Sequence, residues 1–236
     1  MTHPMMEQKR ALGTVAYLGG LASLLEPFCW SWGQMCVYNA EYLAGPGEYV
    51  HTYRARVSDH AVARNAIVDH FLGDWLVMLD TDHEFEPDLV ARLLNAANQY
   101  GLDVLSGLYM FKTPPHYPLA FEWLPNADDD GEHLQQIIGW NVGAGFLEVG
   151  SAGGGCLFVR RSVFDRIRDE LGELPFEHIA PFSEDHSFFL RLRRLGIPAF
   201  VATHIESNHL AVRRVTERAP VPAQVQELEV AGYERG

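Results

Sequence analysis

Trp75-Leu76-Val77-Met78-Leu79-Asp80-Thr81-Asp82 is the stretch of sequence that decides the fold. Its five leading apolar residues show no polar alternation, which predicts a central strand covered on both faces. Two carboxylates then follow at the strand's end, where unpaired charge is costly to bury. A magnesium or manganese ion would resolve that cost, because both prefer hard oxygen ligands and keep positions open for substrate phosphates. The alternative is a solvated turn whose acids complement the positive end of a helix beginning at Pro87.

Strand and helix patterns alternate on both sides of this stretch. Strands are expected at 13–18, 49–58, 75–79 and 104–110, and helices at 21–43, 59–71 and 87–100. Such alternation predicts an α/β fold, with one Rossmann-like, mainly parallel, twisted sheet and helices on both of its faces. In this architecture ligands bind at the carboxyl ends of the strands, where Asp80 and Asp82 lie.

The second half of the chain is less regular before the pattern returns. Residues 112–150 are rich in proline and aromatic residues and predict a small antiparallel element between 135 and 149. Further elements are expected as a strand at 156–159, a helix at 163–171, a helix at 184–195 capped by Ser183 and stopped by Gly196, and a strand at 199–203. We expect one catalytic domain over residues 1–215 and a C-terminal tail over 216–236.

Composition limits the classes of partner. Eighteen basic residues against 31 acidic ones give a net charge of −13, which disfavours stable binding to nucleic acid, although an acidic protein can still hold a phosphate ligand through a bound cation. The three cysteines do not match zinc-ligand spacing or a disulfide framework. No apolar run is long enough for a signal peptide or a transmembrane segment, so we expect a cytoplasmic protein. The oligomeric state stays open, a homo-oligomer included.

Three ordered blocks carry a family resemblance. They are Trp-Leu-Val-Met-Leu-Asp-Thr-Asp-His at 75–83, Ala-Gly-Gly-Gly-Cys-Leu-Phe-Val-Arg-Arg at 152–161 and Ser-Glu-Asp-His-Ser-Phe-Phe-Leu-Arg at 183–191. The chain resembles family 2 glycosyltransferases with the glycosyltransferase A fold, in particular the short bacterial and phage members. The resemblance spans residues 13–212 and implies transfer of a sugar from a nucleoside-diphosphate donor, of the UDP or GDP type, to an unidentified acceptor hydroxyl.

The resemblance also implies roles for individual acids and histidines. Asp80 and Asp82 would hold the metal beside the diphosphate, with His209 as a third protein ligand, although His204 fits the pattern as well. His83 adjoins the carboxylates and is left out of the expected metal set. Asp185 would be the general base of an inverting reaction, supported by Glu184; the alternative for this acid pair is a capped helix start.

Other residues are expected to bind the donor. Arg64 and Asn65 resemble an arginine-asparagine pair beside the nucleotide, where the arginine would contact phosphate or hold the metal-binding acids; the alternative is an exposed helix arginine. Tyr17 would lie near the base unless it is a core tyrosine. Lys112 would contact phosphate or acceptor, or be solvated. Arg213 would close over the diphosphate with its neighbour Arg214, or both would be solvated.

Two other function classes compete with this reading. A nucleotidyltransferase or metal-dependent phosphohydrolase would share aspartates at strand ends, but the first of these normally carries a basic glycine-rich segment early in the chain, and residues 13–25 contain no lysine or arginine. A non-catalytic sugar- or nucleotide-binding protein of the same fold would be expected to have lost one of Asp80, Asp82 and Asp185, and all three are present.

Overall fold

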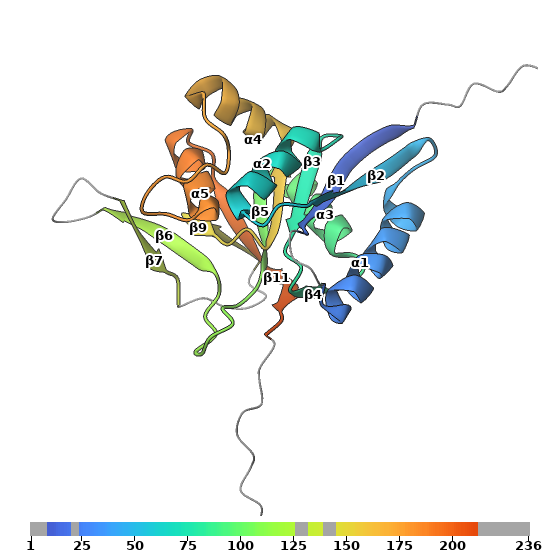
Figure 1. Cartoon of the computed structure of the whole chain (residues 1–236), viewed down its shortest axis with the longest axis horizontal. Helices are drawn as coiled ribbons and strands as arrows, with labels where there is room; N and C mark the ends of the chain where they lie inside the picture. The colour runs from blue at the N-terminus through green and yellow to red at the C-terminus, as the bar shows by residue number, and fades with distance from the viewer. Residues whose placement is uncertain (1–8, 20–23, 126–131, 139–144, 212–236) are drawn as a thin grey trace, which may run out of the picture.

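The computed structural model describes residues 9–19, 24–125, 132–138 and 145–211. Its central sheet contains eight strands, seven of them in the order β2-β1-β3-β10-β5-β11-β4, with β8 paired to β11. Figure 1 shows β2, β1 and β3 side by side in this sheet. These strands are β1 Arg10–Leu18, β2 Glu48–Ala55, β3 Trp75–Leu79, β4 His83–Phe85, β5 Val104–Leu108, β8 Phe146–Val149, β10 Cys156–Arg160 and β11 Ala199–His209. The helical segments are α1 Glu26–Tyr38, η1 Asn39–Leu43, α2 His60–His70, α3 Leu89–Tyr100, α4 Arg161–Arg166, η2 Ile167–Leu171 and α5 Glu184–Arg194.

Strand directions confirm a mainly parallel sheet. β1 pairs in parallel with β2 and β3, and β5 pairs in parallel with β11. Since β10 is antiparallel to both β3 and β5, these two strands share a direction, and β10 alone is reversed among the central strands. The sequence predicted the position of β10 but not its reversal. Its direction depends on the route of the chain through residues 112–150, where the sequence pattern is irregular.

The core lies on both faces of the sheet, as the apolar run predicts. Leu76 and Met78 of β3 point into one buried cluster with α2, α4 and α5, whereas Val77 and Leu79 point into the other, with α1 and α3. The two sets alternate along one strand, as side chains of a strand must. Burial on both sides explains why this strand has no polar alternation.

Residues close in sequence set the ends of three helices, α2, α3 and α5. Asp59 caps α2, because its side chain accepts a hydrogen bond of 2.9 Å from the Val62 amide. Helix α3 begins at Leu89, two residues after Pro87, which lies in the preceding turn. Gly196 follows α5 with φ of 64°, a conformation that glycine adopts at low cost and that ends the helix.

Three strand features exceed the sequence expectation. β4 was not predicted, and β11 continues to His209 instead of ending at residue 203. The two pair antiparallel, with Ser207 opposite Phe85. The small antiparallel element is a three-stranded sheet in the order β7-β6-β9, made by β6 Ala120–Pro125, β7 Glu132–Gln136 and β9 Ser151–Ala152. Its expected position at 135–149 was wrong, because residues 146–149 form β8, which pairs with β11 in the central sheet. Figure 1 shows it beside the central sheet, on the side away from α1.

Among the helices of the described residues, none combines the length and apolar character that crossing a membrane requires. The tail expected at 216–236 lies outside the described residues, and the division at residue 215 stays a prediction.

Candidate active site

The site is built at the carboxyl end of β3, where backbone pairing with the β10 side continues for one residue past the strand. The Asp80 amide donates a hydrogen bond of 2.9 Å to the Gly155 carbonyl. Asp80 and Asp82 both line a pocket of about 100 Å³ together with His60. His60 also contacts the start of α5, with Nδ1 3.9 Å from Glu184 Oε1. The two aspartates therefore line one cleft, and His60 connects its wall to α5.

Arg64 is a buried cation that joins four parts of the fold. Its guanidinium donates to Asp80 Oδ1 at 3.1 Å, to Glu184 Oε1 at 3.3 Å and to the Gly154 carbonyl at 2.9 Å. Its side chain is only 3% exposed. Burial alone would lower the pKa of Arg64, but the carboxylates of Asp80 and Glu184 outweigh burial and raise it. Of the roles expected for Arg64, the geometry corresponds to holding the acids.

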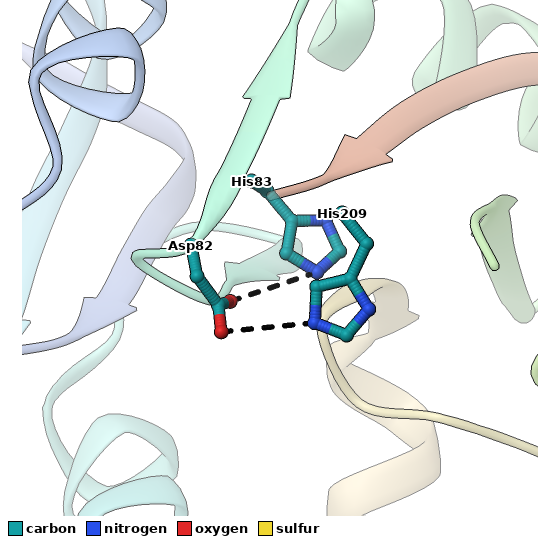
Figure 2. Close-up of side chains that lie close together, drawn as sticks. All are labelled: Asp82, His83 and His209. Carbon is teal, nitrogen blue, oxygen red and sulfur yellow. Dashed lines mark ion pairs between the residues drawn. The ribbon is translucent and has the colours of Figure 1, made fainter. Parts of the chain in front are cut away.

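A second group of side chains forms the candidate metal centre. Ligand atoms of Asp82, His83 and His209 all lie within 4.8 Å of one another. Asp82 Oδ1 is 4.0 Å from His83 Nε2, and Asp82 Oδ2 is 3.6 Å from His209 Nε2. Figure 2 shows both rings presenting a nitrogen to the same carboxylate, His83 from β4 and His209 from the end of β11. The pairing of His83 with His209 in the β4–β11 ladder accounts for this placement.

Both rings turn Nε2 toward Asp82. His209 Nδ1 lies 2.9 Å from the Met110 carbonyl, which can only accept, so Nδ1 carries a proton and Nε2 is the nitrogen that faces Asp82. His83 Nδ1 lies 2.7 Å from the Ser207 hydroxyl, and its Nε2 is buried without a hydrogen-bond partner among the described residues. Burial lowers the pKa of His83 to about 4, so the ring is neutral at pH 7. A buried nitrogen without a partner is costly, and a metal ion would satisfy it.

Gly155 keeps space open beside these groups. A Cβ atom at this position would lie 2.7 Å from His83 Nε2 and 3.1 Å from Asp80 Oδ2. The missing side chain therefore leaves room where Asp80 approaches the metal group, although Asp80 itself is bonded to Arg64 and is not one of its members. One carboxylate and two imidazoles form a donor set that fits a divalent transition metal.

Lys112 contributes a positive charge next to the carboxylate of the candidate metal centre. Its ammonium forms an ion pair with Asp82 Oδ2. Burial by itself would raise the pKa of Asp82, but hydrogen bonds from His209 and Lys112 outweigh it and hold the pKa well below its usual range. Asp82 is therefore ionised at neutral pH. A metal ion that binds Asp82 would compete with Lys112 for the same oxygen.

The acids of α5 have different environments. Glu184 is buried and bonded to Arg64, so it supports the guanidinium and lies away from solvent. Asp185 is half-buried, and its Oδ1 accepts hydrogen bonds from the Ser183 hydroxyl and, at 2.8 Å, from the His186 amide. Burial would raise the pKa of Asp185, but the charge of His186 and the Ser183 bond outweigh it and lower the pKa. Asp185 is thus a carboxylate at neutral pH, the form that a general base requires.

The structure does not bring every expected residue to this group. Asn65 Oδ1 accepts a bond of 3.0 Å from the Phe176 amide and fixes the loop before α5. The half-buried Tyr17 ring has its centroid 4.7 Å from that of Trp32, and its role beside the base stays a prediction. His204 is exposed on β11, with Nδ1 3.3 Å from the Gly145 carbonyl, so of the two candidate histidines it is His209 that meets Asp82. Arg213 lies outside the described residues.

His83 is the member of the group that the sequence analysis omitted. It follows Asp82 directly, and without β4 the two side chains would be expected to diverge. In the strand, residues 83 and 85 lie on one face, but an alternation of three residues, His83-Glu84-Phe85, is too short to predict a strand from the sequence.

Comparisons with known proteins agree with this architecture. The model of the family described as Glycosyl transferase family 2 matches residues 38–168, more than half of the 236 residues. The crystal structure of A197 from STIV is similar at a TM-score of 0.50 and 18% identity, over 86% of this chain and 99% of that one. The crystal structure of GalNAc-T7 with UDP, GalNAc and Mn²⁺ is similar at a TM-score of 0.56 and 12% identity, over 90% of this chain and 46% of that one. None of the curated proteins matches this chain.

Proposed function

Because this chain belongs to glycosyl transferase family 2 and has the glycosyltransferase A fold, we propose that it is a metal-dependent glycosyltransferase. In this proposal a sugar moves from a nucleoside-diphosphate donor to an acceptor hydroxyl with inversion at the anomeric carbon. The observation that carries the proposal is the meeting of Asp82, His83 and His209 beside the cleft that Asp80 and Asp82 line. The GalNAc-T7 structure, which contains UDP and Mn²⁺, supports this donor class and a metal for the fold.

The proposed metal is manganese in preference to magnesium. Asp82, His83 and His209 would hold it through one oxygen and two nitrogen atoms. Magnesium prefers oxygen ligands in octahedral geometry, whereas imidazole suits transition metals better. Bound there, the ion would supply positive charge against the negative charge that develops on the departing diphosphate.

Asp185 is proposed to act as the general base. Its carboxylate takes the proton from the acceptor hydroxyl while that oxygen forms a bond to the anomeric carbon. The bond from the anomeric carbon to the diphosphate oxygen breaks, its electron pair stays on that oxygen, and the nucleoside diphosphate leaves. No covalent intermediate on the protein is required, and attack from the face opposite the leaving group inverts the configuration.

Arg64 and Lys112 have separate proposed roles. Arg64 orients Asp80 and Glu184 through its hydrogen bonds and therefore positions the cleft. Lys112 is bonded to Asp82 in this state, and its ammonium would move from Asp82 to a phosphate oxygen when metal and donor bind. The Asp82 carboxylate would then have a cation beside it in both states: the ammonium before binding and the metal ion after it.

The test is ligand-dependent thermal stability. UDP and GDP are each added with Mn²⁺, with Mg²⁺ and with a chelator, and the melting temperature is measured. We expect stabilisation by one nucleotide, and only with metal present, because a ligand that binds the folded state stabilises it. We expect manganese to act at lower concentration than magnesium. No response to any pair of nucleotide and metal would refute the proposal, whereas equal responses to both metals would refute only the manganese preference.

A further inference from the structure

A second pocket lies behind the candidate metal centre. In the β4–β11 ladder, His83, Ser207 and His209 turn toward the centre, and the residues between them turn to the opposite, exposed face. That outer face lines a pocket of about 590 Å³, larger than the pocket that Asp80 and Asp82 line. Figure 1 shows α1 beside β4, close to where β11 ends. The ladder thus separates two sites that share its strands.

The pocket has a fixed wall on the α1 side. The Phe85 amide of β4 donates a hydrogen bond of 3.1 Å to the Ser31 hydroxyl of α1, and the Phe85 and Phe28 rings are 6.1 Å apart. Trp30, the neighbour of Ser31, lines the pocket and is 66% exposed. An exposed indole at the rim of a pocket offers a flat face for stacking, and a tryptophan side chain has only two χ angles to order on binding.

The remaining lining is polar and of mixed character. It contains the carboxylates of Glu84, Glu86 and Glu206, the amides of Gln34 and Asn208, the guanidinium of Arg92 and the ring of His204. Arg92 also donates a hydrogen bond to the His204 carbonyl. Carboxylates accept hydrogen bonds, whereas amides both donate and accept. A ligand with many hydroxyl groups matches this set because each hydroxyl also donates and accepts. A purely cationic ligand would leave the amide donors unused.

The charge of the pocket lining restricts the class of ligand further. The three carboxylates outnumber the one arginine of the lining, Arg92, and together with the net charge of −13 they disfavour an anionic ligand such as a nucleic acid or a polyuronate. The polar lining disfavours a lipid chain. A neutral sugar chain combines hydroxyl groups with apolar faces of ring hydrogens, which stack on an indole.

We propose that this pocket, defined by Trp30, Gln34, Glu84, Glu86, Glu206 and Asn208, binds a neutral oligosaccharide. Glu206 and Asn208 also line the neighbouring pocket of about 330 Å³ that contains Lys112 and His209. An oligosaccharide bound at Trp30 therefore lies next to the candidate centre, separated from it by the thickness of the β4–β11 ladder. The site needs neither donor nor metal to bind its ligand.

The experiment measures binding to metal-free protein in a chelator. Maltohexaose, cellohexaose and chitohexaose are titrated separately while ligand signals are followed by saturation-transfer NMR. We expect at least one to bind, and Trp30→Ala to weaken that binding by about tenfold or more. Glu206→Gln, which keeps the shape and removes the charge, is expected to weaken it by a smaller factor. Tyr42→Ala is the matched control, since Tyr42 is 70% exposed in η1 and does not line the pocket.

The outcomes separate this proposal from the transferase proposal. Absence of binding by all three oligosaccharides, or equal loss in Trp30→Ala and Tyr42→Ala, would overturn the oligosaccharide site. Tighter, Trp30-dependent binding of the polyamine spermine would also overturn it and assign the pocket to a cation. Because donor and metal are absent, a protein that fails to bind nucleotide in the thermal test leaves this result unchanged.

Discussion

Arg64 shows how a single residue decides which acids of the site stay fixed. Its guanidinium is bonded to Asp80 and Glu184, which belong to different elements of the fold. Asp80 is therefore held by the protein, whereas Asp82 is held by Lys112 and the imidazoles, groups that a metal ion can displace or join. Two acids separated by one residue thus have different partners.

Removing the Arg64 guanidinium is expected to destabilise the fold. In Arg64→Met the carboxylate of Glu184 stays buried without its cation, and breaking a buried ion pair from one side costs about 3 kcal/mol or more. The free energy of unfolding, measured by urea titration, should fall by that amount. Arg54→Met is the control, because Arg54 is exposed and donates to the Gly19 carbonyl, so its loss should cost less than about 1 kcal/mol. Similar losses in both variants would contradict a special role of Arg64.

Asp185 is expected to separate binding from chemistry. Asp185→Asn removes the proton acceptor but retains an oxygen that can accept the Ser183 and His186 hydrogen bonds. Metal-dependent nucleotide stabilisation should therefore be unchanged, while sugar transfer, followed by nucleotide release with an acceptor found by mass spectrometry, should fall by at least about a hundredfold. Undiminished turnover would remove Asp185 from the mechanism.

His83 is expected to contribute directly to metal affinity. His83→Asn removes the nitrogen that lies 4.0 Å from Asp82 Oδ1 and should weaken manganese binding, measured by calorimetry, by at least about tenfold. Substitution of the exposed His204 on β11, His204→Asn, serves as the control and should leave the affinity unchanged. An unaltered manganese affinity in His83→Asn would exclude His83 as a ligand.

At the scale of elements, the sequence predicted what local patterns encode. The double-sided burial of β3 and the Gly196 stop of α5 both depend on residues close together in the chain, and both are present. β4 is only three residues long, and it is a strand because it pairs with β11, more than a hundred residues later. Periodicity cannot detect so short a strand, and for that reason His83 was not expected beside His209.

The connection between β9 and β10 provides an element-scale test. Gly155→Ala would place a methyl group 2.7 Å from His83 Nε2 and 3.1 Å from Asp80 Oδ2. Because the strands on either side pair through their backbones, we expect a folded protein with at least about tenfold weaker manganese binding. Circular dichroism would report the fold and calorimetry the affinity. Gly33→Ala on α1, where an added Cβ meets no atom within 4 Å, is the matched substitution and should bind manganese normally.

At the scale of the whole molecule, the sheet gathers residues that are distant in the chain at its carboxyl-terminal edge. The guanidinium of Arg64 on α2 bonds both Asp80, at the end of β3, and Glu184, at the start of α5. A mainly parallel sheet brings these ends together, so the fold class predicted the location of the site. The fold class could not predict which histidine or arginine contacts the acids of the site, because side-chain contacts depend on the register of strands and helices.

The pH dependence of global stability tests the burial of His83 in the metal-free protein. Its pKa is about 4 in the folded state and 6.5 when unperturbed, so between these values the unfolded chain binds a proton that the folded chain does not. Stability must therefore be fully present above pH 6.5 and fall as the pH drops toward 4, by roughly 3 kcal/mol from this group. Urea unfolding in a chelator, repeated across this range, would measure the loss. His83→Asn should show a shallower pH dependence because the titrating ring is gone, whereas groups that titrate in both proteins cancel in the comparison. If the two proteins lost stability in parallel, His83 would not be the buried neutral imidazole on which the proposed metal centre depends.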